Sequence, residues 1–468
     1  MNLQARPSLA VAAATLSAGA LAGVAAATIG PRSAGIVAGA AVAVGLLRSA
    51  GFAFALYLLV PPFLKGLLQP LVPFDLTVAL GLACIFHVVY GIVAKPISIK
   101  LSALTLWFAL LAMITVGSLY APDQSFAFSR VQNWIALVLL PLLVAFWVAS
   151  DQRELKRFIW TCLAVGLFVT FASIVAFSPA QRLVLGFSST INVGRGSLMV
   201  PIIVFFFVMK DGPTWIRGPL VAIVPLTLIV SVAAGARGPL VMFLAVAAAL
   251  SIWHVARGRR IGKGVVAGVA VAGLGLAIVA AVTPLPSVSL DRFDRLTAYV
   301  SGGSTPADGS LDMRLAAADL SMSIFEEHPA LGAGTGAFAY YTQTVPLIAV
   351  LDSPHNILLE LASDWGVMGL TLFALLVLAA IRRRPPTPIW TAVWGVFLFL
   401  LANVLLGNFF DNREFWGFAL LLLAAPVAVR SQRRIADPNE ATVPSPEQVH
   451  VGRRRHLRDT SAKREGLV

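Results

Sequence analysis

Long apolar segments recur along almost the whole chain, and they constrain its fold more than any other feature. Most are about 17–22 residues long, the length that an α-helix needs to cross the hydrocarbon core of a bilayer. Hydrophobic residues make up 58% of the 468 residues and charged residues only 12%, whereas soluble domains carry about 25% charged residues. Since helices fit these lengths better than barrel strands, we expect an all-α, polytopic membrane helix bundle with about 12–14 transmembrane helices.

Clusters of Lys and Arg predict the orientation of this bundle. The formal net charge is +13, and in a membrane protein such an excess is typical of cytoplasmic loops rather than of nucleic-acid binding. The clusters fall on alternate connections, at 95–100, 153–157, 257–263, 382–384 and 430–434. We therefore expect these connections, together with both termini, on the cytoplasmic side.

The chain is expected to divide into four regions. Residues 1–283 are predicted to form an N-terminal transmembrane bundle, and 355–430 the C-terminal transmembrane helices. Between them, 284–354 is predicted to be a long external loop that contains short helices, because basic clusters flank it on both sides. The segment 431–468, rich in Arg, Pro, Ser and Glu, is predicted to be a disordered, basic cytoplasmic tail.

One arginine, Arg237, stands alone in the apolar stretch VSVAAGARGPLVMFLAV. No other charged residue occurs in 218–256, and an arginine at the centre of a bilayer costs about 2.5–3.5 kcal/mol on insertion scales. Pro239 favours the first turn of a new helix. We therefore expect 215–234 and 238–256 to form a hairpin with Arg237 at its outward-facing tip. An arginine that only snorkels to lipid headgroups is the alternative.

A histidine follows the external loop in the stretch SPHNILLELASDWGVMGL. Ser353 is predicted to cap a membrane helix and Pro354 to take its first position, which places His355 and Asn356 in the first turn. The positive end of the helix disfavours a protonated imidazole, so His355 would stay neutral and could act as a base. The same end can bind an anion through free N–H groups. An interfacial histidine that merely caps the helix is the alternative.

A second arginine and a glycine-rich segment precede this histidine in the external loop. Arg314 begins a predicted amphipathic helix that ends at EEHPALGAGTGAF. Gly332, Gly334 and Gly336 resemble a loop that cradles phosphate, but neither a preceding strand nor a following Gly-Lys-Ser/Thr supports that interpretation. We expect these glycines to form a tight turn that returns the chain to the membrane surface.

Two further segments carry polar residues at the expected outer face. Arg195 lies in INVGRGSLMVP, and Asp411 lies in the short turn NFFDNREFWG. Asp411 and Arg413 are candidates to assist at a site, with a simple ion pair at the turn as the alternative.

Taken together, these motifs resemble the O-antigen ligase and O-antigen polymerase (Wzy-like) superfamily of membrane glycosyltransferases. SIFEEHPALGAGTGAF followed by HNILLELASDWGVMGL carries the resemblance, as does the arginine at the upstream hairpin tip. The family's essential hairpin arginine matches Arg237, its loop-helix arginine matches Arg314, and its histidine matches His355. The resemblance implies transfer of a glycan from undecaprenyl diphosphate in the outer leaflet to a glycan, lipid or protein acceptor, with no cofactor and no bound metal.

This chemistry fits the residue types. Arginine stays protonated and presents a planar fork of donors that suits a diphosphate, while a neutral histidine can take a proton from an acceptor hydroxyl. Attack opposite the leaving group would invert the anomeric centre. His355, Arg237 and Arg314 are thus predicted to be catalytic. The predicted substrate-binding residues are Arg237, Arg314, Arg195, Asn356 and Asp411.

The sequence leaves two questions open: whether a transferase of this kind is a ligase or a polymerase, and whether the protein is instead a transporter. Ligase and polymerase activity are both consistent with it. A transporter or flippase of lipid-linked sugars would place charged residues at mid-membrane and show internal repeats, whereas here the notable charges fall on one face. We expect a multi-pass protein of the bacterial cytoplasmic membrane with its active site on the outer face. Its expected partners are the lipid-linked donor, the acceptor and membrane lipids, and not nucleic acid.

Overall fold

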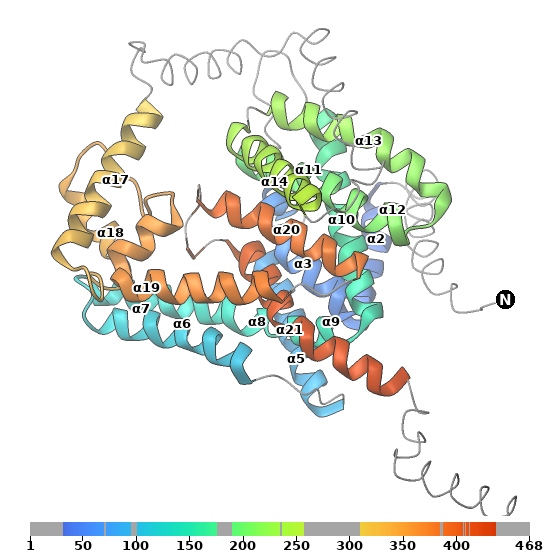
Figure 1. Cartoon of the computed structure of the whole chain (residues 1–468), viewed down its shortest axis with the longest axis horizontal. Helices are drawn as coiled ribbons and strands as arrows, with labels where there is room; N and C mark the ends of the chain where they lie inside the picture. The colour runs from blue at the N-terminus through green and yellow to red at the C-terminus, as the bar shows by residue number, and fades with distance from the viewer. Residues whose placement is uncertain are drawn as a thin grey trace, which may run out of the picture.

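The chain forms a bundle of helices (Figure 1). The computed structural model describes residues 31–69, 72–94, 101–175, 190–234, 236–256, 309–383, 387–405, 407, 409–410 and 412–436. Within these ranges nearly every segment is helical, and none of it is a strand. Of the four expected regions, residues 1–30, 257–308 and 437–468 lie outside the described residues, and residues 431–436 of the expected disordered tail instead form the end of the helix Arg413–Ala436.

Six helices of the described part are long and apolar enough to cross a membrane, which confirms the predicted polytopic helix bundle. They are Leu76–Ala94, Gln124–Ser150, Gln152–Val175, Ile191–Asp211, Thr214–Ala233 and Ile357–Arg382. Shorter apolar helices accompany them, at Gly39–Arg48, Ala50–Phe63, Leu104–Leu119, Gly238–Ala249 and Pro388–Val404. The total number of spans in the whole chain stays a prediction.

The described helices follow in chain order. In the first half they are α2 (Pro31–Arg48), α3 (Ala50–Phe63), α4 (Lys65–Leu68), α5 (Leu76–Ala94), α6 (Leu101–Leu119), α7 (Gln124–Trp134), α8 (Leu140–Leu142), α9 (Ala145–Ser150), α10 (Gln152–Val175), α11 (Thr190–Ile203) and α12 (Met209–Asp211). In the second half they are α13 (Thr214–Ala233), α14 (Arg237–Ala256), α17 (Gly309–Glu327), α18 (Ala337–Tyr341), α19 (Ile357–Arg382), α20 (Pro388–Val404) and α21 (Arg413–Ala436).

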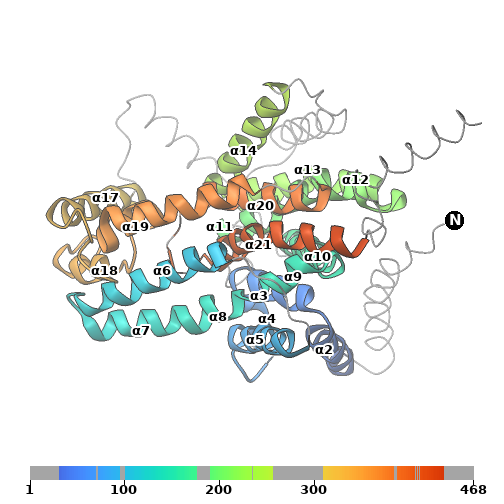
Figure 2. The same cartoon turned by 60° about the horizontal axis from the view of Figure 1, so that its bottom comes forward.

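The bundle has two chemically different ends (Figure 2). The loop end carries α17, α18 and the start of α19, and there Tyr120 Oη at the end of α6 donates to the Leu331 carbonyl at 2.7 Å. The basic end carries α12 and the start of α10, and there Ser49 Oγ donates to the Glu154 carboxylate at 2.7 Å. Basic residues at the basic end are Arg48, Arg153, Lys156, Arg157 and Lys210.

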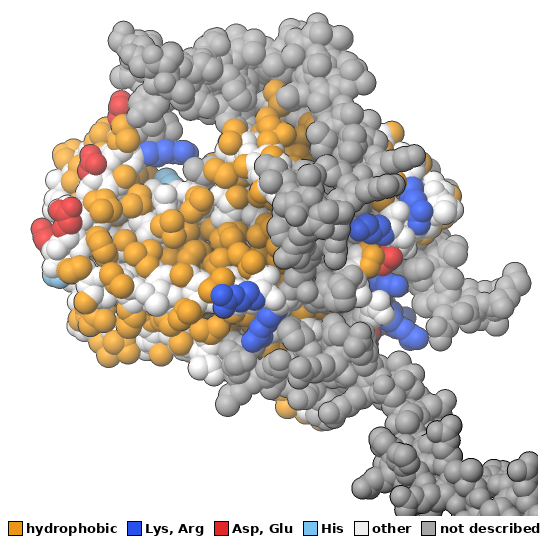
Figure 3. All heavy atoms as spheres, in the orientation of Figure 1, with side chains coloured by type: hydrophobic (Ala, Val, Ile, Leu, Met, Phe, Trp, Pro, Cys, Tyr) orange, Lys and Arg blue, Asp and Glu red, His pale blue; other side chains and the backbone are white. Residues whose placement is uncertain are grey.

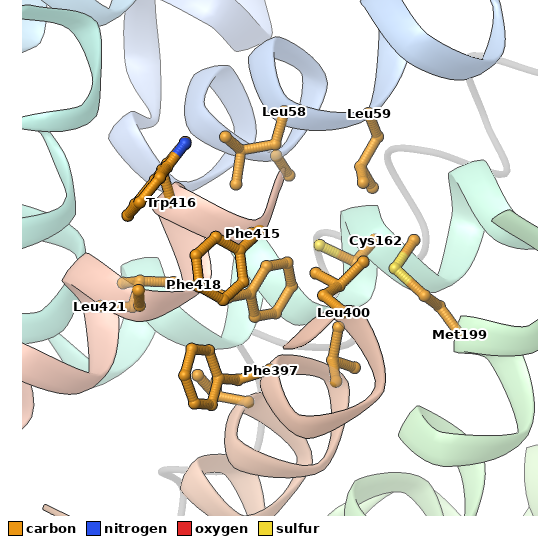
Figure 4. Packing of buried hydrophobic residues seen from close by; sticks show 14 of the residues in the cluster. Leu58, Leu59, Cys162, Met199, Phe397, Leu400, Phe415, Trp416, Phe418 and Leu421 are labelled. Atoms are coloured by element: carbon orange, nitrogen blue, oxygen red, sulfur yellow. The ribbon is translucent and has the colours of Figure 1, made fainter. Parts of the chain in front are cut away.

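Large apolar side chains fill the interior of the bundle (Figure 4). Leu58 of α3, Met199 of α11 and Phe397 of α20 meet there around the start of α21. The Phe415 ring of α21 stacks on the Phe397 ring with 5.6 Å between centroids. Aromatic pairs of this kind add about 0.5–1.5 kcal/mol beyond the apolar area that they bury, so this pair helps to fix α20 against α21.

The surface agrees with a membrane environment. Hydrophobic side chains cover much of the face between α17 and the centre of the bundle (Figure 3). Acidic side chains gather at the edge formed by α17, where the exposed acidic residues are Asp312, Asp319, Glu326 and Glu327. The loop end is therefore polar and acidic on its outside, while the adjoining helix surface is apolar.

Candidate functional site

The glycine-rich segment enters a break in α19. At Gly366 the helix takes φ 60° and ψ −152°, which are not helical angles. Beyond the break, the Val367 N–H donates to the Pro329 carbonyl at 2.8 Å. Before it, the Ala333 N–H donates to the Ser363 carbonyl at 2.9 Å. The glycine loop thus replaces hydrogen bonds that the break removes from the helix. Gly366 therefore serves a close contact between α19 and this loop.

Three glycines let the loop fit this break. Gly332, Gly334 and Gly336 all have positive φ, at 69°, 101° and 80°. A Cβ on Gly332 would lie 2.4 Å from the Asp364 carbonyl carbon, and one on Gly334 would lie 2.6 Å from an α-carbon of the connection after α6. These are backbone atoms that cannot move aside. The positions therefore require glycine for the turn itself, as the sequence predicted.

The Asp364 carboxylate occupies the N–H groups of this turn. Asp364 is fully buried, and it accepts hydrogen bonds from the Gly336 N–H at 2.7 Å and the Phe338 N–H at 3.2 Å. Backbone N–H groups that already bind a carboxylate are not free for a phosphate. The turn interpretation is therefore favoured over direct ligand binding by these glycines.

The start of α19 differs from the sequence expectation. The helix begins at Ile357, and its N-cap is Asn356, whose Oδ1 accepts from the N–H groups of Leu358 and Leu359 at 2.9 and 3.3 Å. The prediction that Ser353 is the cap, with His355 inside the first turn, is wrong. Asparagine is as good a cap as serine, and Ser353 is fully buried in the preceding loop. Two of the N–H groups expected to bind an anion are occupied by Asn356.

His355 therefore immediately precedes the cap. It is exposed, and its φ of 52° makes it the one non-glycine residue with positive φ in the described part of the chain. Such a conformation costs on the order of 1–3 kcal/mol and persists only where the surroundings impose it. Strained residues of this kind cluster at functional sites, so the backbone gives a second reason, independent of the motif, to single out this histidine.

Arg314 lies on a helix, as predicted, but this helix, α17, begins at Gly309 and not at Arg314, so Arg314 lies in its second turn with an exposed side chain. The buried side of α17 passes through Ala317, which packs in a small apolar cluster with Phe338 and Ile348. This cluster joins α17 to the segment that leads to His355.

The expected pair of helices is confirmed, since α13 ends at Ala233 and α14 begins at Arg237, whereas the outward orientation of the tip stays a prediction. The turn is closed by hydrogen bonds from the Ala236 N–H to the Ser231 carbonyl at 3.1 Å and from the Leu240 N–H to the Ala236 carbonyl at 3.2 Å. The side chain of Arg237 lies outside the described part of the structure. The prediction that it meets Arg314 and His355 in one cavity stays a prediction.

Arg195 lies in α11 and is held by protein side chains. Its guanidinium forms an ion pair with Glu414 at 2.7 Å, and it donates to the Asn412 Oδ1 at 3.0 Å and to Asn192. Its Nε is buried and has no hydrogen-bond partner among the described residues. Sequence reasoning singled out Arg195 but missed Glu414, because only the fold brings α11 and α21 together. Asp411 lies outside the described residues.

Arg130 of α7 also contacts the loop end, although no role was predicted for it from the sequence. Its guanidinium reaches the segment before His355 and the first turn of α19. These partners are more than 200 residues away along the sequence; Asp352, for example, is separated from Arg130 by 222 positions. No local sequence pattern could therefore have revealed the contacts.

Residues 221–374 match the family model described as O-antigen ligase. The matched stretch runs from α13 into α19 and contains Arg237, Arg314 and His355, whereas Arg130 and Arg195 lie outside it. Comparison with curated proteins gave no match. The matched stretch has the hairpin, the loop helix and the histidine in the order that the resemblance requires. This stretch, about a third of the chain, is therefore similar to the O-antigen ligase family.

Proposed function

We propose that this protein transfers a glycan from undecaprenyl diphosphate to an acceptor hydroxyl in the outer leaflet, with inversion at the anomeric carbon and without a metal ion. The observation that carries the proposal is the O-antigen ligase match over 221–374, because one continuous stretch contains both arginines and the histidine. The strained, exposed backbone of His355 supports it from the structure.

Arg237 and Arg314 are proposed to hold the diphosphate. The leaving group carries concentrated negative charge, and guanidinium groups bind phosphate oxygens through paired N–H donors. Donors already in place where charge develops stabilise the transition state without reorganisation. Arg237 begins α14 at a hairpin tip, where a lipid diphosphate would lie at the bilayer edge.

His355 is proposed to be the general base. The acceptor oxygen forms a bond to C1 of the donor sugar while the bond from C1 to the diphosphate oxygen breaks. The hydroxyl proton passes to the imidazole, and undecaprenyl diphosphate leaves. General-base assistance of this kind is worth about 10²–10⁴-fold in rate.

Three other residues are proposed to bind substrate. Asn356 can donate from Nδ2 to a glycan hydroxyl while its Oδ1 caps α19. Arg195 is neutralised by Glu414, so its proposed role is to donate hydrogen bonds to the substrate and not to supply charge. Asp411 is proposed to line the sugar side of the site.

The proposed location is the bacterial cytoplasmic membrane with the loop end outward. The acceptor is a glycan, a lipid or a protein, so the activity is that of a ligase or a polymerase.

The test compares the lipid-linked glycan pool with the mature polymer in cells that carry single variants. His355→Ala is expected to accumulate undecaprenyl-linked glycan and to lose the polymer at normal protein level. His328→Ala is the matched control, because His328 is an exposed histidine of the same loop, and it is expected to behave as wild type. Normal polymer from His355→Ala would overturn the proposed role of the histidine.

A further inference from the structure

Arg130 joins α7 to the segment that carries His355. Its Nη2 donates to the Asp352 carbonyl at 3.1 Å and lies 3.9 Å from the Asp352 carboxylate. Its Nη1 lies 3.7 Å from the Glu360 carboxylate. One planar group thus bridges the residue three positions before His355 and the residue five positions after it.

Two aromatic rings hold this guanidinium in place. The guanidinium carbon lies 5.0 Å from the centre of the Phe126 ring and 4.8 Å from that of Phe410. A cation between two ring faces is attracted to both. The Arg130 side chain is only 13% exposed, so this arrangement is largely removed from water.

Glu360 extends the connection to the segment before α21. Its side chain is 1% exposed, and its second carboxylate oxygen accepts from the Phe409 N–H at 2.6 Å. The first turn of α19 is therefore fixed to α7 through Arg130 and to the 409–410 turn through Phe409.

His355 lies between these fixed points. Pro354 is buried, and Ile357 is fully buried. Because Pro354 and Ile357 are buried on either side and the Asp352 carbonyl is tied to Arg130, the backbone around His355 is restrained both before and after it. A left-handed residue persists only where its surroundings over-determine it, and Arg130 supplies one such restraint from outside the family-matched stretch.

We propose that Arg130 is a positioning residue for His355: by tying Asp352 to Glu360, it holds the left-handed backbone that aims the imidazole at the acceptor hydroxyl. The proposal rests on the proposed function, in which His355 is the base. Arg130 itself touches neither the donor nor the acceptor.

The first test separates turnover from binding. The purified protein is assayed in detergent, with membranes of a deletion strain of the source organism supplying the unused lipid-linked glycan and its acceptor. Arg130→Gln is expected to lower kcat by about 10–100-fold, as a misplaced catalytic group does, while KM for the donor stays within about threefold. A wild-type kcat, or a loss confined to KM, would overturn the proposal.

Two variants control for a general effect on folding. Arg157→Gln removes a guanidinium from an ion pair at the basic end, and it is expected to leave kcat unchanged. Arg130→Lys keeps a cation between the two rings but loses the planar fork, so kcat is expected to fall between those of wild type and Arg130→Gln. A wild-type kcat for Arg130→Lys would show that the fork geometry is not needed and would contradict the proposal.

A double-mutant cycle with His355→Ala gives the decisive readout. If Arg130 acts through His355, Arg130→Gln has no further effect on the residual rate of His355→Ala. Losses that multiply would show that Arg130 acts independently of the histidine and would overturn the proposal. A fully active His355→Ala variant would refute the proposed function. If His355→Ala is inactive but Arg130→Gln is fully active, only the positioning role of Arg130 is refuted.

Discussion

Gly366→Ala tests the break in α19. At φ 60° and ψ −152° the backbone occupies a region that is essentially confined to glycine, and forcing another residue into it costs on the order of 1–3 kcal/mol. A Cβ would also lie 2.6 Å from the Pro329 carbonyl oxygen and 2.7 Å from the Gly332 nitrogen. Overpacking of this kind costs about 1–3 kcal/mol more. The substitution is therefore expected to destabilise the loop end by about 2–6 kcal/mol.

Gly218→Ala is the matched control. Gly218 lies in α13, it is exposed, and a Cβ there would meet nothing within 4 Å. Alanine inside a helix is favoured over glycine by about 1 kcal/mol, so this variant is expected to be as stable as wild type or slightly more stable.

The assay is thermal unfolding of the purified protein in detergent, together with limited proteolysis of the 329–336 loop. Gly366→Ala is expected to unfold at a clearly lower temperature and to be cleaved faster in this loop. If it matches wild type in both measurements, the broken helix and the loop inserted in it are not the structure of the protein.

Three other predictions follow from the same contacts. Asp364→Asn keeps the shape of the side chain but places an amide against the Gly336 and Phe338 N–H groups. The loop end is expected to lose about 1–3 kcal/mol of stability, measured as faster amide hydrogen exchange at these residues. Unchanged exchange would contradict this prediction. Glu414→Leu leaves the Arg195 cation buried without its carboxylate, which is expected to lower the free energy of unfolding by about 3–5 kcal/mol. Combining it with Arg195→Met is expected to restore much of this lost stability. Equal melting temperatures for the single and double variants would refute this prediction. In intact cells a membrane-impermeant maleimide is expected to label Glu326→Cys on α17 but not Arg153→Cys at the basic end, with little background because Cys84 and Cys162 are buried; the reverse pattern would invert the topology.

Helices that are marked by a pattern of neighbouring residues could be predicted from the sequence. Apolar segments of bilayer length identified the helices, and the proline after Arg237 located the start of α14. An amphipathic helix that contains Arg314 was predicted from the sequence, and its buried side passes through Ala317 and Ile324.

The features that the sequence missed depend on contacts between distant segments. The apolar pattern of α19 continues through Gly366, so nothing in it marks a break that exists because the 329–336 loop supplies the missing hydrogen bonds. Ser353 and Asn356 are both good helix caps by residue type, and only the burial of Ser353 in the preceding loop decides between them.

The central claim, that the protein itself cleaves the bond between glycan and undecaprenyl diphosphate with His355 as base, is tested most directly in detergent solution. Without a membrane there are no compartments, so a transporter or flippase has nothing to move, and only a transferase releases undecaprenyl diphosphate. The measurement is the amount of undecaprenyl diphosphate released from lipid-linked glycan, extracted from a deletion strain, in the presence of acceptor. Wild type and His328→Ala are expected to release it at equal rates, and His355→Ala about 10²–10⁴-fold more slowly. No release by the wild-type protein, or equal release by His355→Ala, would contradict the account.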